Sequence, residues 1–409
     1  MDGRAHVSRR PPVFLHCGWR TRGTWIWNRF RRMPGITAYY EPLSDMLASL
    51  RPDGFASLHA GDWASGHNFL DRPYFVEFEP LLARERAGVR GYRSSFATAD
   101  FFAPPDANLP DLERYLQLLL RTAATRSRQP VLKFCRSLGR IGWMQQKFPD
   151  AVNIAVLRNP LGQFASSYRQ FALHNNLYFL AMPLLLLAAH RDLPPVRDCM
   201  QLLAIKLPGP SMADCETRVL SGSLADCYRC FMAFWILTAA RIPDSVDLVI
   251  DTDLLAHSSW YRRECQLRLA KLTGQTFEFG PRHDDASSAA SEYRPHSAEI
   301  LATHHAAEAF LADYAGTEWC GNAAPALLGK LLAEASMRAL TVAACNVQPA
   351  QLGELHLAAR RATQAERELT AVLTSRSWKM TAPLRWLGGW LALQQRPLAA
   401  AVPPCVETP

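Results

Sequence analysis

The residues best placed to do chemistry lie in a short turn, GWRTRGTW at residues 18–25, which follows an apolar run at residues 13–17. We expect the run to form a buried strand and a helix to begin at Thr24. The first N–H groups of that helix then lack acceptors, and its dipole presents positive charge to the turn. Such a turn binds anions. Arg20 adds a permanent charge and Thr24 a hydroxyl donor, which suits a phosphate or sulfate group. A strand-to-helix turn with incidental glycine and arginine residues is the alternative.

A second pattern of the same kind follows another apolar run, residues 152–157. Arg158 comes directly after this run, and Ser166 falls within a helix expected over residues 162–173. The carboxyl ends of parallel strands are where α/β sheets bind ligands, so we expect both side chains to converge on one phosphate near the first turn. An arginine that caps a strand and stays solvated is the alternative.

The segments GWRTRGTWIW and VLRNPLGQFASSYRQF together resemble the two nucleotide-binding signatures of the sulfotransferases, which transfer a sulfuryl group from 3′-phosphoadenosine 5′-phosphosulfate (PAPS). The resemblance covers about residues 12–275. It implies a P-loop-like α/β fold, PAPS as co-substrate, a 5′-phosphosulfate loop in the first segment and a 3′-phosphate site in the second. Arg22 and Gly23 depart from the family, which has glycine and then threonine or serine there. The donor-binding residues that the resemblance implies are Arg20, Thr21, Arg22, Gly23, Thr24, Trp25, Arg158 and Ser166.

Sulfuryl transfer builds negative charge on the departing phosphate, and fixed cations and N–H donors stabilise that charge without a metal ion. We expect Arg20 to do so and Glu41 to accept the proton of the acceptor hydroxyl. The segment YYEPL around Glu41 is similar to the Glu-Pro segment of carbohydrate sulfotransferases, and an ordinary structural carboxylate is the alternative. His59 and His67 are further candidate bases, although surface histidines are the simpler interpretation.

The end of the strand expected at residues 131–134 is lined by three basic residues, Lys133, Arg136 and Arg140. At a strand end they would contact the donor or an anionic acceptor, and a solvated cluster is the alternative. The family carries a late basic loop at the 3′-phosphate, for which Arg282 is the candidate counterpart. VDLVIDTDLL at residues 246–255 resembles the strand and acidic element of the family.

Alternating apolar runs and helical patterns predict the fold class, an α/β domain with a P-loop-like parallel sheet flanked by helices and a helical C-terminal tail. The expected strands are residues 13–17, 36–40, 131–134, 152–157 and 246–250. The expected helices are residues 24–32, 112–126, 141–147, 162–173, 223–240 and 260–272. The expected domains are a basic leader at 1–12, a sulfotransferase-like domain at 13–330 and the helical tail at 331–409. The irregular residues 50–108 and residues 172–221 are expected to line the acceptor cleft.

The tail differs from the rest of the chain in its pattern. A heptad repeat of apolar and small residues begins at Leu355, which predicts a short coiled coil or docking helix. Trp378, Trp386 and Trp390 then stand among basic residues, a mixture suited to a membrane interface, while packing on the main domain is the alternative. The segment SRSWKMTAPLRWL is similar to C-terminal segments of bacterial surface-glycan glycosyltransferases. The N-terminal residues 1–12 lack the apolar region of a secretory signal, so we expect a cytoplasmic protein. The tail adds the expectation of peripheral contact at the inner face of the membrane.

Composition excludes several classes of protein. The 45 Lys and Arg residues exceed the 37 Asp and Glu, for a formal net charge of +8, and 49% hydrophobic residues exclude a disordered chain. The longest apolar stretch, residues 177–189, contains a proline and is shorter than the roughly 18 residues that suggest a spanning helix. Cys227 and Cys230 are expected to be buried thiols on a helix, so no metal site is expected. Basic residues concentrate at strand ends and in the tail, which favours an anionic donor and a membrane surface over nucleic acid.

The sequence leaves three functions open. The favoured one is a sulfotransferase that acts on a carbohydrate, a bacterial surface polysaccharide or glycolipid. The second is a P-loop-type nucleotide-dependent kinase. It has less support, because no Lys with Ser or Thr follows Gly23 and only Asp251 or Asp253 is placed to hold magnesium. The third is a non-catalytic glycan-assembly protein with a degenerate loop.

Overall fold

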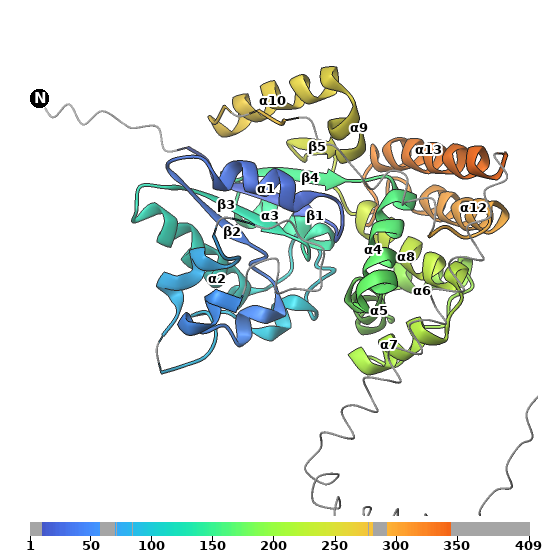
Figure 1. Ribbon diagram of the computed structural model, residues 1–409, viewed down its shortest axis with the longest axis horizontal. Coiled ribbons are helices and arrows are strands. Elements are labelled where there is room, and N and C mark those ends of the chain that lie inside the picture. Colours follow the sequence, from blue (N-terminus) through green and yellow to red (C-terminus); the bar gives the residue numbers. More distant parts are fainter. Residues whose placement is uncertain are drawn as a thin grey trace, which may run out of the picture. The chain divides into compact units, whose positions relative to one another are not determined.

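Five parallel strands form the centre of the described part of the chain (Figure 1). The computed structural model describes residues 10–57, 70, 72–83, 85–276, 278–280 and 293–344. The strands are β1 (Val13–Cys17), β2 (Ile36–Tyr40), β3 (Gln129–Phe134), β4 (Val152–Leu157) and β5 (Leu248–Asp251). They lie in the order β2-β3-β1-β4-β5, and β1 to β4 are buried throughout, as expected for a sheet covered on both faces. The predicted α/β fold with a parallel sheet is confirmed.

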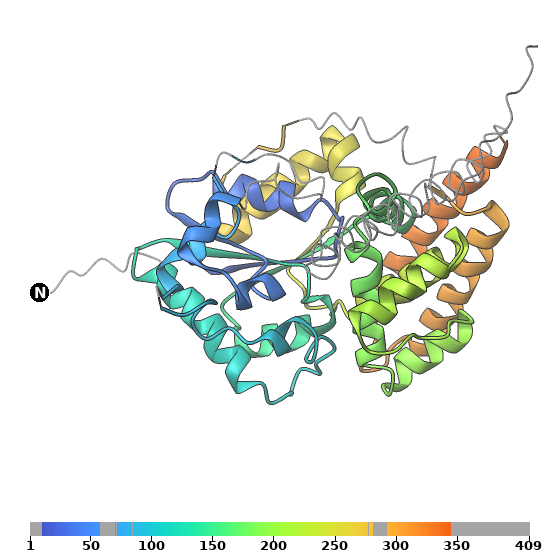
Figure 2. The same cartoon turned by 60° about the horizontal axis from the view of Figure 1, so that its bottom comes forward.

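Helices cover both faces of this sheet (Figure 2). Helices α1 (Gly23–Arg31) and α10 (Ser259–Thr273) lie on one face, and α2 (Pro110–Ala124) and α3 (Ile141–Lys147) lie on the other. The sequence of α2 explains its place, because its buried residues recur every three or four positions and form one apolar stripe. The helix starts with a proline in its first turn. Proline is well tolerated there, because an N–H group at that position would have no acceptor within the helix.

The chain leaves β1 and β4 in opposite directions. From β1 it passes through α1 to β2 at one edge of the sheet, and from β4 it passes through several helices to β5 at the other edge. Ligands of open α/β sheets bind at such a switch point, in the crevice outside the carboxyl ends of the two strands. The turns that follow Cys17 and Leu157 therefore meet where a ligand site is expected.

A group of helices packs beside the sheet (Figure 1). Its members are α4 (Pro160–His174), α5 (Tyr178–Ala189), α6 (Pro194–Leu202), α7 (Met212–Ser221), α8 (Leu224–Ala239), α12 (Ser297–Tyr314) and α13 (Ala324–Ala344). Helix α13 has buried residues from Leu328 through Ala335, so the domain boundary expected at residue 330 falls inside one continuous packed helix. None of the helices in the described ranges is long and apolar enough to cross a membrane.

The two segments expected to line the acceptor cleft differ from each other. Between β2 and α2 the chain forms short 3-10 turns, η1 (Asp45–Ala48), η2 (Pro52–Ser57), η4 (Val76–Leu81) and η5 (Ser94–Ala97). Residues 172–221 are instead largely helical. Other predicted features lie outside the described residues, and these are leader residues 1–9, His59, His67, Arg282, and the heptad and tryptophan segments of the tail.

Candidate functional site

The turn after β1 is held in an unusual backbone conformation. Arg20 and Arg22 have φ values of 63° and 66°, in the left-handed region that residues with a Cβ seldom occupy. Helix α1 begins directly afterwards at Gly23, where an added Cβ would lie 2.4 Å from Cys17 Sγ and 3.3 Å from Lys133 Cε. Only glycine lets the helix start so close to the sheet. The N–H groups of Gly23 and Thr24 therefore open the helix at the carboxyl end of β1, where they have no intrahelical acceptor.

The two expected anion-binding segments meet in the structure. Arg20 Nε donates a hydrogen bond to Ser166 Oγ on α4 at 3.1 Å, and the Arg20 guanidinium lies 5.2 Å from the ring centroid of Phe179. Arg158, directly after β4, donates from Nη1 to the carbonyl oxygen of Arg20 at 3.2 Å. The expected juxtaposition of Arg20, Arg158 and Ser166 is thus observed, and the Arg158 side chain is 11% exposed rather than solvated. That these groups bind a phosphate stays a prediction.

Arg22 points away from the turn and toward α9 (Thr252–His257), the short helix that follows β5. Its Nη1 lies 2.7 Å from Asp253 Oδ1 and 3.0 Å from the carbonyl oxygen of Thr252. Asp253 also lies 3.5 Å from Arg158 Nε and accepts a hydrogen bond from the N–H of Asn159 at 3.1 Å. Burial opposes ionisation of Asp253, but Arg158 and Arg22 outweigh it and hold the pKa of this carboxyl below its usual range. Asp253 is therefore the counter-ion of both arginines.

Glu41, the expected proton acceptor, is a buried partner of Lys133. It follows β2 with a φ of 47°, and its Oε1 accepts from Lys133 Nζ while its Oε2 accepts from the N–H of Cys135 at 3.0 Å. Burial opposes ionisation of Glu41, but Lys133 and Arg136 outweigh it, so the pKa of Glu41 lies below its usual value. Burial also opposes the charge of Lys133, yet Cys135 and Glu41 hold its pKa well above the usual value. Both groups of the pair are therefore charged at neutral pH.

Arg136 and Arg140 are also buried, so the alternative of a solvated cluster is wrong for these two arginines and for Lys133 near the end of β3. Arg136 Nη2 donates to Asp45 Oδ1 at 2.8 Å and to the Tyr178 hydroxyl, and its guanidinium lies 5.4 Å from the Trp19 ring centroid. Burial opposes its charge, but Tyr178 and Asp45 raise the pKa of Arg136 above its usual value. Arg136 therefore ties the β1 turn to η1 and α5.

Arg140 ends η6 (Leu138–Arg140) and makes far weaker polar contacts. Its Nη2 donates to the carbonyl oxygen of Phe96 at 3.0 Å, and burial lowers the pKa of Arg140 to about 10. Its guanidinium lies 6.0 Å from the Phe101 ring centroid. Arg140 thus packs under the 3-10 turns and is not directed at the β1 turn by any of these contacts.

The remaining residues of the first turn have local partners. Thr21 Oγ1 donates to the carbonyl oxygen of Gly18 at 2.8 Å, inside the turn, and Thr24 Oγ1 lies 3.4 Å from the Tyr40 hydroxyl. The Trp25 ring packs at 5.2 Å from that of Phe279. The Thr24 hydroxyl therefore lies at the first turn of α1 with a long contact to Tyr40, whereas that of Thr21 stabilises the turn itself.

Two further predictions concern groups that could hold a metal. Cys227 and Cys230 are buried on α8, as predicted. Asp251 accepts from the N–H groups of Asp253 and Leu254 at 2.9 and 3.1 Å, so its carboxylate caps α9. Both carboxylates considered as magnesium ligands are thus engaged by this chain's own groups.

The sequence did not indicate Trp19, Asp45 and Tyr178 as neighbours of the site. It placed Asp253 in the acidic element at residues 246–255 and as a candidate magnesium ligand, but not as a partner of the arginines. One feature of the sequence could have identified these residues: each lies shortly after a strand or near the start of the next helix, where α/β sheets place their ligand-binding side chains. Their partners come from elements far apart in the chain, so only the fold reveals the contacts.

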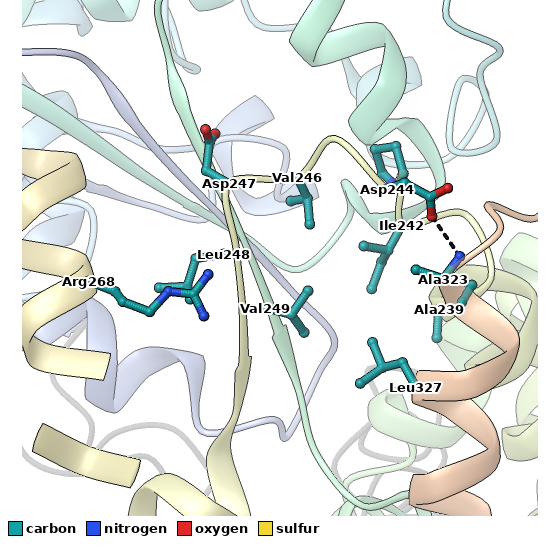
Figure 3. A pocket seen from close by; sticks show the side chains of 12 residues that line it. Ala239, Ile242, Asp244, Val246, Asp247, Leu248, Val249, Arg268, Ala323 and Leu327 are labelled. Atoms are coloured by element: carbon teal, nitrogen blue, oxygen red, sulfur yellow. Dashed lines mark hydrogen bonds between the residues drawn. The ribbon is translucent and has the colours of Figure 1, made fainter. Parts of the chain in front are cut away.

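A cavity of about 270 Å³ lies elsewhere, along the start of β5 (Figure 3). Its walls are mainly apolar, and Arg268 of α10 reaches its rim. Asp244 beside it accepts from the N–H of Ala323 at 2.9 Å, and Asp247 accepts from the N–H of Asn153 at 2.8 Å. Because β5 begins here, the cavity lies at the amino end of the sheet, away from the crevice at the carboxyl ends.

The site at the carboxyl ends of β1 and β4 therefore combines the N–H groups of Gly23 and Thr24, which open a helix, with two arginines and a serine hydroxyl, and this chemistry suits a multiply charged anion. No family model matches the chain, and no curated protein or solved structure is significantly similar to it.

Proposed function

We propose that the protein is a sulfotransferase that moves the sulfuryl group of PAPS to a hydroxyl of a carbohydrate, a bacterial surface polysaccharide or glycolipid. The observation that carries this proposal is the contact between the two motif segments. Arg20 Nε lies 3.1 Å from Ser166 Oγ, and Arg158 Nη1 lies 3.2 Å from the Arg20 carbonyl oxygen, at the switch point of the sheet. The two signatures that resemble those of the sulfotransferases thus form one site.

The donor has two anionic ends, and the site offers two sets of groups for them. The N–H groups at the start of α1, the Thr24 hydroxyl and Arg20 would hold the 5′-phosphosulfate. Arg158 and Ser166 would hold the 3′-phosphate. Negative charge that develops on the bridging oxygen during transfer would meet Arg20 and the helix N-terminus, which are already in place and need no reorganisation.

The acceptor hydroxyl must lose a proton, and Glu41 is the candidate group. Its carboxylate is ionised at neutral pH but is a weak base, because its pKa is below the usual value. Its oxygens are engaged by Lys133 and by the N–H of Cys135, so Glu41 would accept a proton only after Lys133 moves toward the donor. The Cε atom of Lys133 lies 3.3 Å from the position that a Cβ on Gly23 would take. The Glu41–Lys133 pair therefore lies next to the proposed donor loop.

The test uses the full-length protein with radiolabelled PAPS and a panel of polysaccharides and glycolipids. We expect transfer of label to at least one glycan and binding of 3′-phosphoadenosine 5′-phosphate by calorimetry. Absence of both would overturn the proposal. Transfer of label from ATP in the presence of magnesium would identify the kinase alternative instead, and no nucleotide binding at all would favour the non-catalytic alternative.

A further inference from the structure

The outward face of α10 exposes two large apolar side chains. Trp260 is 73% exposed and Leu267 is 65% exposed, the highest values among the large hydrophobic residues that the structure describes. They stand seven residues apart, which is close to two helical turns, so both project from the same face. Trp260 lies at the start of α10, soon after β5 ends and therefore at the carboxyl end of the sheet.

The fold does not use these two side chains for packing. The opposite face of α10 carries Cys265, Leu269 and Thr273, all buried against the rest of the domain. Those positions lie about half a turn away from Trp260 and Leu267 around the helix. The apolar surface of α10 is therefore divided into an inner set that stabilises the fold and an outer set that contributes nothing to the core.

Positive charge surrounds the outer apolar pair. Arg263, Arg268 and Lys271 are exposed on this side of α10, against a single acidic residue, Glu264. Within the described residues, none of these three basic side chains forms an ion pair. The outer face therefore presents a tryptophan, a leucine and three cationic groups together, a combination that suits contact with a surface of anionic lipid headgroups.

We propose that this face of α10 docks on a membrane surface that contains anionic lipids. Two apolar side chains two turns apart are too small a patch for a stable protein interface, which buries roughly 1,200 Å² or more. They fit a peripheral contact with lipid, in which arginine and lysine pair with lipid phosphates and the two apolar side chains enter the headgroup region. Docking through α10 places the carboxyl end of β5, and with it Asp253 and the neighbouring candidate site, near the lipid headgroups. The residues of this surface are different from those of the C-terminal tail for which membrane contact is expected.

The test is co-sedimentation of the full-length protein with two kinds of vesicle, one of phosphatidylcholine alone and one of phosphatidylcholine and phosphatidylglycerol in equal parts. We expect the wild-type protein to bind the anionic vesicles at least about tenfold more tightly than the neutral ones. Trp260→Ser with Leu267→Ser should weaken anionic binding by about tenfold or more. Arg263→Glu with Lys271→Glu should remove the preference for anionic lipid. Met337→Ser, at a side chain 64% exposed on α13, is the matched control and should bind like wild type.

A second measurement covers the case in which a double variant fails to fold. Brominated lipid quenches the fluorescence of tryptophan within the bilayer interface, and Trp260→Phe keeps the side chain apolar. Quenching of wild type should exceed quenching of this variant. The proposal is overturned if the α10 variants bind vesicles like wild type, or if neutral and anionic vesicles bind alike. It is also overturned if the α10 variants abolish self-association in sedimentation velocity without changing vesicle binding, because the face would then bind a second copy of the chain. Binding of 3′-phosphoadenosine 5′-phosphate, measured in parallel, should not change, so this result stands apart from the proposed function.

Discussion

Arg22 and Asp253 form a buried ion pair, with Nη1 and Oδ1 2.7 Å apart and both side chains 8% exposed. They are 231 positions apart in the chain, one in the turn after β1 and the other in the first turn of α9. Asp253 also lies 3.5 Å from Arg158. Arg22, which stands where the sulfotransferase signature that this turn resembles has a small residue, is thus directed out of the turn. It joins the proposed 5′-phosphosulfate and 3′-phosphate sites through one carboxylate.

Replacing Asp253 with asparagine should change stability and donor binding in opposite directions. Two buried guanidinium groups lose their counter-ion, so we expect unfolding to become easier by about 3 kcal/mol. A phosphate that enters the site no longer competes with a carboxylate, so 3′-phosphoadenosine 5′-phosphate should bind roughly tenfold more tightly. Urea unfolding and calorimetry measure the two effects. Asp251→Ala, which removes the side-chain cap of α9 and leaves Asp253 in place, should cost about 1 kcal/mol and leave binding unchanged. Weaker donor binding in Asp253→Asn would show that the carboxylate positions the arginines instead of competing for them.

Arg20→Ala and Arg158→Ala should each weaken binding of 3′-phosphoadenosine 5′-phosphate by about 10- to 100-fold, the value of one charge-assisted hydrogen bond. Ser166→Ala removes a neutral hydroxyl and should have a smaller effect, about fivefold. Isothermal titration calorimetry gives the affinities. Arg197→Ala on α6, whose side chain is 64% exposed, is the matched control for loss of an arginine. If both arginine variants bind like wild type, the donor site is elsewhere.

Much of the sheet could be predicted from the sequence, because short apolar runs bounded by proline and glycine identify buried parallel strands. The strands at residues 13–17, 36–40 and 152–157 are observed as expected. Helices α5 to α7 could not be predicted in the same way. Helix α5 is apolar on all sides, so its sequence has no helical period and differs from a buried strand or a membrane segment only in length.

The contacts of the site depend on strand order, which the sequence does not contain. Arg20, Arg158 and Ser166 could be predicted to meet because each follows the carboxyl end of a strand at a known motif spacing. The pairing of Glu41 with Lys133 could not, since it requires β2 to lie beside β3 with Tyr40 opposite Lys133. The N–H of Glu41 then bonds to the carbonyl oxygen of Lys133 at 2.8 Å, which places the two side chains together.

Glu41→Gln should destabilise the protein by about 3 kcal/mol, because it leaves the buried charge of Lys133 without a partner. Adding Lys133→Met should recover part of this loss in urea unfolding, since it removes the buried charge that Glu41→Gln leaves without a partner. The same double variant tests the catalytic assignment. If Glu41 accepts the proton, sulfuryl transfer stays lost although stability returns. Recovery of transfer together with stability would assign Glu41 a structural role alone.

Two buried histidines should make the protein less stable in weak acid. Burial lowers the pKa of His16 and of His304 from 6.5 to about 4, and His16 contacts Ser137 and Asn153 through its two ring nitrogens. Between pH 6.5 and 4 the unfolded chain binds protons that the folded chain does not, so stability falls as the pH falls through this window. Each histidine contributes up to about 3 kcal/mol to the decline. Urea unfolding at several pH values should show a shallower decline for His16→Gln, and a slope that remains as steep as in wild type would contradict the assignment.

Gly23→Ala should disrupt the start of α1 and with it the candidate donor loop. The new Cβ would lie 2.4 Å from Cys17 Sγ and 3.0 Å from Cys17 Cβ, and such overpacking costs about 1–3 kcal/mol. Cys17→Ala removes the nearer atom, so the double variant should regain part of the stability and of the affinity for 3′-phosphoadenosine 5′-phosphate. Gly329→Ala on α13 is the matched control, because an added Cβ there meets no atom within 4 Å in the described structure and should stabilise the helix by up to about 1 kcal/mol. If Gly23→Ala binds and unfolds like wild type, α1 does not require this close approach to β1, and the geometry assigned to the loop is wrong.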